Sequence, residues 1–283
     1  MVPADEREAL RALLEWQIEL GADEAIGDRA VDRFAEGDRA ARDAEPARPG
    51  PTAAAEARDA TGQPPAAPAE AADIDVAVAE AEAAAAAADS LDALREAIAA
   101  YPHCELRKGA RNLVFADGNP KARVMIIGEA PGRDEDRAGR PFVGRAGQLL
   151  DRMLAAIGLD RNAEDPRRAV YITNVLPWRP PHNREPTVEE IRMMLPFLRR
   201  HIELVGPEVL VLMGNTPCQA ILGRKGITRL RGKWTEAMGL PVLPTFHPAY
   251  LLRTPSAKRD AWSDLLALRA RLGLGDSDRK EES

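Results

Sequence analysis

The sequence has few cysteines and no long apolar run. Its two cysteines, Cys104 and Cys218, are too few for a disulfide scaffold, so we expect a protein of the reducing cytoplasm. No stretch approaches the roughly 18 consecutive apolar residues that a membrane-spanning helix needs. The first ten residues, MVPADEREAL, lack the basic segment of a secretory signal. These features argue against both a secreted, disulfide-stabilised protein and a membrane protein.

The spacings that indicate metal or covalent catalysis are also missing. The four histidines form no H-x-x-x-H pair, no C-x-x-C is present, and no serine lies in G-x-S-x-G. We therefore expect chemistry that needs neither a zinc ion nor a serine nucleophile.

The net charge of −6 hides two segments of opposite sign. Residues 1–90 carry a net charge of −13, and residues 91–283 carry +7. A basic segment joined to an acidic one suggests that the basic part binds a polyanion, although an ordinary basic enzyme surface would show the same excess.

Composition divides the chain into four expected segments. They are an N-terminal helical segment over 1–40, an Ala/Pro-rich linker over 41–89, a folded domain over 90–273, and a disordered tail over 274–283. The linker has no aromatic residues and few branched apolar ones, so it can bury too little surface to offset its chain entropy. We expect at most a transient helix near its end. Ser90 then has the position of an N-cap before the next helix.

Strand-like and helix-like runs alternate through the predicted domain. The strands are expected over 123–128, 169–175, 209–214 and 241–246, and the helices over 144–158, 187–205, 216–223 and 256–272. Strands that are apolar along their whole length and separated by helices favour a parallel sheet covered on both faces. The fold class is therefore α/β, and we expect a three-layer α/β/α sandwich with a central, mainly parallel sheet of four strands.

Functional side chains follow the ends of these strands. Glu129 comes directly after the first strand, Asn174 lies at the end of the second, and His247 follows the fourth. Phe142 lies farther along the loop that leaves the first strand. Ligands of parallel sheets bind at this carboxyl edge. An aromatic ring, an amide and a hydrogen-bond donor suit a flat, polar heterocycle.

Three ordered stretches resemble the uracil-DNA glycosylase superfamily, and most of all its family 4. They are GEAPGRDEDRAGRPFVGRAGQLL (128–150), NVLPWRPPHNREPTVEE (174–190) and TFHPAYLLR (245–253). The resemblance covers roughly residues 91–272. It implies a monofunctional glycosylase that removes uracil from DNA and so initiates base excision repair.

The resemblance implies a base-binding role for five residues. Phe142 would stack on the flipped base, and Asn174 would pair with the Watson–Crick edge of uracil. Glu135 would block the C5 position, where thymine carries its methyl group. Glu129 and Ala130 would line the sugar side of the pocket.

Catalysis would rest on three residues by the same resemblance. His247 would donate a hydrogen bond to uracil O2, which stabilises the charge that develops on the leaving base. Some branches of the superfamily place a water-activating aspartate where this chain has Ala130. Activation of water would therefore fall to a backbone carbonyl, to Glu129 or to Asn183, and the sequence leaves these three open.

Contacts to the DNA would come from residues around the same motifs. Leu251 and Leu252 would act as a wedge and Arg253 as a phosphate clamp, with Arg145 and Arg184 as further candidate phosphate contacts. Taken singly, such leucines are typical of a core, and arginines of an ordinary surface.

The chain departs from family 4 at the positions of an iron–sulfur cluster. Members of that family usually hold a four-iron, four-sulfur cluster on four cysteines. Here Tyr101, Trp178 and Met194 stand at three of these positions, and only Cys104 remains. One thiolate cannot hold a cluster that needs four. We therefore expect no cofactor, and a hydrophobic plug in place of the cluster.

Other functions remain open at the level of sequence. The same pocket could accept another deaminated base, such as hypoxanthine or xanthine. The chain could instead be a non-catalytic protein that binds damaged DNA, or a hydrolase of small nucleosides. We expect a monomer whose partner is uracil-containing DNA.

Overall fold

The computed structural model describes residues 68–274. The helical segment expected over 1–40, most of the expected linker and the last nine residues lie outside this range. Among the described helices, none combines the length and the apolar character that crossing a membrane requires.

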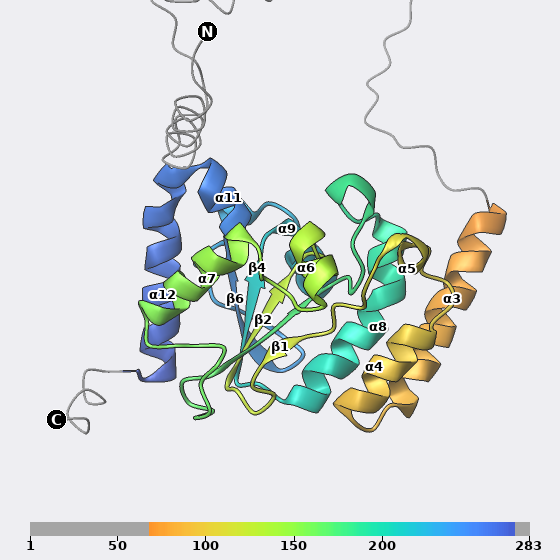
Figure 1. The fold of residues 1–283 in the computed structure, drawn as a ribbon, viewed down its shortest axis with the longest axis horizontal. Coiled ribbons are helices and arrows are strands. Elements are labelled where there is room, and N and C mark those ends of the chain that lie inside the picture. The colour runs from red at the N-terminus through yellow and green to blue at the C-terminus, as the bar shows by residue number, and fades with distance from the viewer. Residues whose placement is uncertain (1–67, 275–283) are drawn as a thin grey trace, which may run out of the picture. The chain divides into compact units, whose positions relative to one another are not determined.

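A mixed sheet forms the centre of the described domain (Figure 1). Within the described residues it has six strands in the order β1-β3-β2-β4-β6-β5. The strands are β1 (Asp117–Gly118), β2 (Val124–Gly128), β3 (Val170–Asn174), β4 (Val209–Met213), β5 (Thr235–Ala237) and β6 (Leu240–Thr245).

The four predicted strands are the parallel centre of this sheet. β3, β2, β4 and β6 pair parallel to one another, whereas β1 and β5 add antiparallel edges. The expected total of four strands is therefore wrong. β1 has two residues and β5 has three, which is shorter than the run of about four to eight residues by which a strand is recognised in a sequence.

Helices cover both faces of the sheet. The longer ones are α3 (Pro68–Ala87), α4 (Leu91–Ala100), α7 (Arg145–Ala155), α8 (Val188–Val205), α9 (Asn215–Leu222) and α12 (Lys258–Leu272). The shorter ones are α5 (Leu106–Gly109), α6 (Arg133–Ala138), α10 (Ile227–Leu230), α11 (Pro248–Arg253), and the 3₁₀ turns η1 (Pro181–Asn183) and η2 (Pro255–Ala257).

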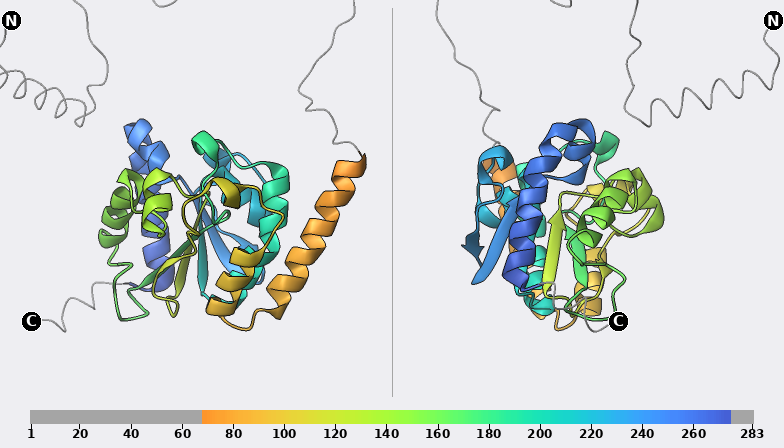
Figure 2. Two further views of the ribbon diagram at one scale, coloured as in Figure 1. Left: turned by 45° about the vertical axis from the view of Figure 1, so that its right-hand side comes forward. Right: turned by 90° about the vertical axis from the view of Figure 1, so that its left-hand side faces the viewer.

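Alternation along each strand sends its side chains to opposite faces of the sheet. Val124 and Ile126 pack with α7 and α12, whereas Met125 and Ile127 pack with α4, α8 and α9. The left view of Figure 2 shows the sheet between these two groups of helices. Every residue of β2, β3 and β4 is buried, as expected for parallel strands covered on both faces.

The helix α3 lies in the segment that the sequence analysis assigned to the linker. It packs along α8, and Ala77, Ala81 and Ala85 are buried in the core. The hydroxyl group of Tyr101 donates to the carbonyl of Ala77 over 2.7 Å. The expected linker boundary at residue 89 therefore differs from the structure, in which the packed domain extends back into α3. Ser90 does cap α4, because its hydroxyl accepts from the N–H of Ala93.

Candidate active site

A pocket of about 290 Å³ opens at the carboxyl edge of the parallel strands. This volume is at the small end of the range for ligand pockets, which runs from about 300 to 1,000 Å³. Nine of the twelve site residues expected from the sequence line it: Glu129, Ala130, Glu135, Phe142, Asn174, Asn183, Arg184, His247 and Arg253. The ends of β2, β3 and β6 thus bring together residues that are far apart in the chain.

The floor of the pocket forms where two side chains cross Gly128. β2 and β3 pair in parallel register, which sets Gly128 opposite Asn174. A Cβ atom on Gly128 would lie 2.4 Å from the Asn174 Oδ1 and 2.6 Å from the Phe142 ring. Only glycine lets the amide and the ring approach the strand this closely. The pocket therefore holds an aromatic face next to a directional amide.

Glu135 holds the loop that carries Phe142. One carboxylate oxygen accepts the N–H groups of Val143 and Gly144, over 3.0 and 2.9 Å. The other accepts the N–H of Gly132 over 3.1 Å. The acid that was predicted to exclude a methyl group is thus fixed in place, because three backbone donors bind its carboxylate.

His247 has a defined tautomer. It is the N-cap of α11, and its Nδ1 accepts the N–H of Ala249 over 3.1 Å. Nδ1 must therefore be unprotonated, which leaves the proton of the neutral ring on Nε2. Burial, together with the positive charge of Arg253, lowers the pKa of His247 to about 4. At neutral pH the site contains an uncharged Nε2–H donor.

The rings of His247 and Phe142 lie face to face. Their centroids are 5.3 Å apart, and their planes differ by 28°. The donor and the aromatic surface therefore occupy one side of the pocket, where a single planar ligand could contact both.

Glu129 has a partner that the sequence analysis missed. The hydroxyl group of Thr216, in the first turn of α9, donates to Glu129 Oε2 over 2.6 Å. Burial raises the pKa of the Glu129 carboxyl above its usual value, and the hydrogen bond from Thr216 acts to lower it. No sequence motif points to Thr216, because it follows β4, a strand outside the three resembling stretches.

The loop after β3 supplies Asn183 and Arg184. Asn183 has φ of 54°, in the left-handed region that asparagine tolerates, and its Oδ1 accepts from Arg179 Nε over 2.8 Å. Arg184 binds both carboxylate oxygens of Glu190, over 2.8 and 2.6 Å. The charge of Arg184 is therefore largely neutralised within the protein.

Three of the expected DNA-binding residues do not line the pocket. Arg145 is exposed at the first position of α7. Leu251 is 1% exposed and packs in a core cluster with Leu149 and Phe246, whereas Leu252 is partly exposed. Of the two leucines proposed as a wedge, Leu252 is thus the one with accessible surface.

The positions of the family 4 cluster do not fit an iron–sulfur centre. Tyr101, Cys104, Trp178 and Met194 are all buried within the same core cluster. They offer one thiol, and the hydroxyl of Tyr101 already binds the α3 backbone. Between residues 68 and 274, no group of three or more His, Cys, Asp or Glu side chains is arranged to hold a metal ion. The donor set therefore cannot supply four thiolates.

The chain is also similar in sequence to known proteins. The sequence model of the Uracil DNA glycosylase superfamily matches residues 115–266. The chain is 43% identical over 185 residues to the Type-4 uracil-DNA glycosylase of Archaeoglobus fulgidus, covering 62% of this chain and 90% of that protein. It is 38% identical over 191 residues to the Type-4 uracil-DNA glycosylase of Sulfurisphaera tokodaii, covering 64% and 84%. It is also 42% identical over 169 residues to the Type-4 uracil-DNA glycosylase of Thermotoga maritima, covering 59% and 85%.

Proposed function

The chain belongs to the uracil-DNA glycosylase superfamily, and from that membership we propose that it hydrolyses the N-glycosidic bond of uracil in DNA. The observation that carries this proposal is the pocket itself. It combines an aromatic face, a fixed amide and an uncharged imidazole donor at one sheet edge.

Recognition requires a flipped base, because an enzyme cannot reach the glycosidic bond inside the stacked duplex. The base would stack on Phe142, and the Asn174 amide would hydrogen-bond to its Watson–Crick edge. Glu135 lines the same pocket and is held by three backbone N–H groups. A fixed carboxylate there would exclude the methyl group of thymine, and we therefore expect uracil to be selected over thymine.

The proposed role of His247 follows from the movement of negative charge onto the base during cleavage. The bond between C1′ and N1 breaks, its electron pair moves onto the uracil ring, and the sugar gains oxocarbenium character. The Nε2–H of His247 would donate to O2 as negative charge builds there. A neutral donor suffices, because its hydrogen bond strengthens as the acceptor becomes anionic.

A water molecule completes the reaction by attacking C1′ and releasing a proton. Glu129 is our candidate for accepting that proton, because burial raises its pKa and so makes its carboxylate a better base. Asn183 lines the same pocket and could orient the water.

The phosphate backbone would meet the rim of the pocket. Arg253 lines the pocket and is exposed, whereas Arg184 is already paired with Glu190. We therefore assign the principal phosphate contact at the pocket to Arg253, and the contact with the neighbouring base stack to Leu252.

An oligonucleotide assay tests the proposal directly. The protein is incubated with DNA that carries uracil, hypoxanthine or thymine at one position, and abasic sites are then cleaved with alkali. We expect cleavage at uracil, opposite guanine and in single strands, with or without EDTA. Substitution Asn174→Ala should abolish most of this activity, since it removes the base-reading amide. Equal release of thymine and uracil would refute the pocket assignment, and release of hypoxanthine alone would refute uracil as the substrate.

A further inference from the structure

We propose that Arg161 is a positioning residue for Phe142, and that it fixes the aromatic face on which the base stacks. Arg161 does not line the pocket, and it lies outside the three resembling stretches. The proposal rests on the proposed function only in assuming that Phe142 contacts the base.

Phe142 needs external support because its backbone conformation is unfavourable. Its φ is +52°, in the left-handed region that bulky residues rarely adopt. Such a conformation persists only where the surrounding structure determines it, and it is common at functional sites. Phe142 is also 5% exposed, with its ring pressed against Gly128. The ring therefore keeps its orientation only as long as its backbone does.

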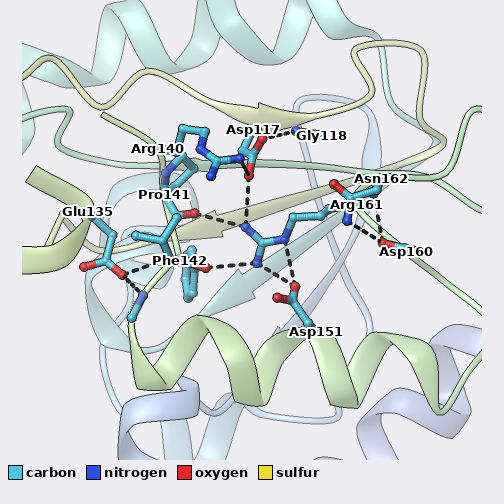
Figure 3. A network of polar contacts seen from close by, with 12 residues as sticks. Asp117, Gly118, Glu135, Arg140, Pro141, Phe142, Asp151, Asp160, Arg161 and Asn162 are labelled. Atoms are coloured by element: carbon cyan, nitrogen blue, oxygen red, sulfur yellow. Dashed lines mark hydrogen bonds and ion pairs between the residues drawn. The ribbon is translucent and has the colours of Figure 1, made fainter. Parts of the chain in front are cut away.

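Arg161 binds the backbone carbonyls on both sides of this strained position (Figure 3). Its Nη1 donates to the carbonyl of Pro141 over 3.1 Å, and its Nη2 donates to that of Phe142 over 3.0 Å. The guanidinium is held in turn by Asp151, over 2.7 Å, and by Asp117, over 3.1 Å. Arg161 is 8% exposed, and its two bonds to the carbonyls are buried, away from competing water.

The chain after Phe142 is fixed from the other direction. Glu135 accepts the N–H groups of Val143 and Gly144, so donors and acceptors hold consecutive peptide groups (Figure 3). The Phe142 carbonyl also lies against α7, because a Cβ atom on Gly147 would come within 1.8 Å of its oxygen. Movement of the loop would break bonds on both sides of the ring.

Arginine suits this position because its planar guanidinium has several N–H donors that point in different directions. It serves two carbonyls and two carboxylates at once, whereas an ammonium group has one donor centre. Loss of Arg161 would leave the two carbonyls without these donors and would release the loop from Asp117 and Asp151. The ring could then leave the orientation that stacking needs.

The first experiment measures single-turnover excision of uracil by Arg161→Met and Arg161→Lys. We expect a loss of about 10²-fold for methionine, the size of effect that a displacement of about 1 Å can have, and a smaller loss for lysine. The matched control is Arg123→Met. Arg123 also binds a carboxylate, Glu208, and a carbonyl, Leu272. It directly precedes β2 and so lies at the amino ends of the parallel strands, whereas the pocket lies at their carboxyl ends. The control should change the rate less than twofold.

A double-mutant cycle separates positioning from a general loss of structure. If Arg161 acts through Phe142, then Arg161→Met should cost much less in a Phe142→Ala background than in the wild-type protein. Losses that multiply independently would overturn the proposal. If the methionine variant does not fold, the same cycle is run with Arg161→Lys.

A second readout does not depend on which base is excised. The chain has five phenylalanines, so protein labelled with fluorophenylalanine gives few ¹⁹F signals, and Phe142→Leu identifies that of Phe142. This signal should shift or broaden in Arg161→Lys and stay unchanged in Arg123→Met. An unchanged Phe142 signal in the Arg161 variant would overturn the proposal, even if the wild-type protein cuts uracil. Conversely, a wild-type protein that leaves uracil intact would refute the proposed function and not this positioning role.

Discussion

Substitution of His247 by asparagine should separate the two roles of this side chain. Through Nδ1 it caps α11, by accepting the N–H of Ala249. Through Nε2–H it is proposed to donate to the leaving base. Asparagine is among the best N-caps, but its amide is too short to cap the helix and reach the Nε2 position together. The variant His247→Asn should therefore keep the cap and lose the donor.

The two effects differ in size. Loss of one oxyanion-type donor costs about 10²–10³ in rate, or roughly 3–4 kcal/mol. Loss of a cap costs about 1 kcal/mol of stability, which lowers Tm by about 2–4 °C in a domain of this size. His247→Asn should thus lose about 10²-fold in single-turnover rate with an unchanged Tm. His247→Ala should lose a similar factor in rate and also melt earlier.

Single-turnover cleavage at saturating enzyme measures the chemical step, and fluorescence anisotropy measures DNA binding. Both His247 variants should bind uracil-containing DNA nearly as well as the wild type, because phosphate contacts dominate affinity. The control Arg253→Ala should show the reverse, with weaker binding, a shallower salt dependence and nearly intact chemistry. Since the pKa of His247 is about 4, this residue should cause no rate inflection near pH 6.5. A His247→Asn protein that cuts at the wild-type rate would refute the donor mechanism.

Three further predictions concern other parts of the domain. Thr216→Val should raise the pKa of Glu129 further, because it removes the hydrogen bond that lowers this pKa. The acid limb of the pH–rate profile should therefore move to higher pH. The control Thr216→Ser keeps the hydroxyl group and should leave the acid limb in place. A chain that starts at Ser90 should unfold at a lower urea concentration than one that starts at Pro68, since it loses four buried alanines at about 0.8 kcal/mol each. Equal urea midpoints for the two chains would show that α3 contributes no stability. Burial lowers the pKa of His201 to about 3, so below about pH 6.5 the unfolded chain takes up a proton that the folded chain does not. The free energy of unfolding should therefore decrease as the pH is lowered through this window, by at most about 1.4 kcal/mol per pH unit from this group. Urea titrations at pH 7 and pH 4 measure this decrease, which should be smaller in His201→Gln.

The parallel centre of the fold is predictable because its signal is local. Each central strand is a short apolar run that ends at a glycine, an asparagine or a loop motif. Each is followed along the chain by a helix whose apolar residues recur at helical spacing. The strand ends then place Glu129, Asn174 and His247 at one sheet edge, as the rule for parallel sheets requires. The edge strands β1 and β5 have no such signal, because they are formed by pairing with β3 and β6.

The packing of α3 into the domain could not be predicted from the sequence, for a different reason. Its buried residues Ala77, Ala81 and Ala85 recur every four positions, as on one face of a helix. The exposed positions between them, such as Ala79 and Ala83, are also alanine, so no apolar stripe stands out against the rest. Its packing is instead determined from outside, by α8 and by the hydroxyl of Tyr101. That tyrosine stands at one of the positions where the resemblance to family 4 implies a cluster cysteine, and here it contacts α3 instead.

The supporting residues of the site were the hardest to foresee, because their partners are backbone groups or lie on other strands. Arg161 reaches back about twenty residues to the carbonyls of Pro141 and Phe142. Thr216 reaches Glu129 from α9, the helix that follows β4, and β4 pairs with β2 on the side away from β3. Sequence motifs are typical of residues that contact the ligand. An arginine that binds two backbone carbonyls belongs to no such motif. The strained φ of Phe142 indicates that the surrounding structure holds this residue in place, and the bonds from Arg161 and to Glu135 are part of that support. The search for positioning residues in this fold should therefore begin at the strained backbone and proceed outward to its hydrogen-bond partners.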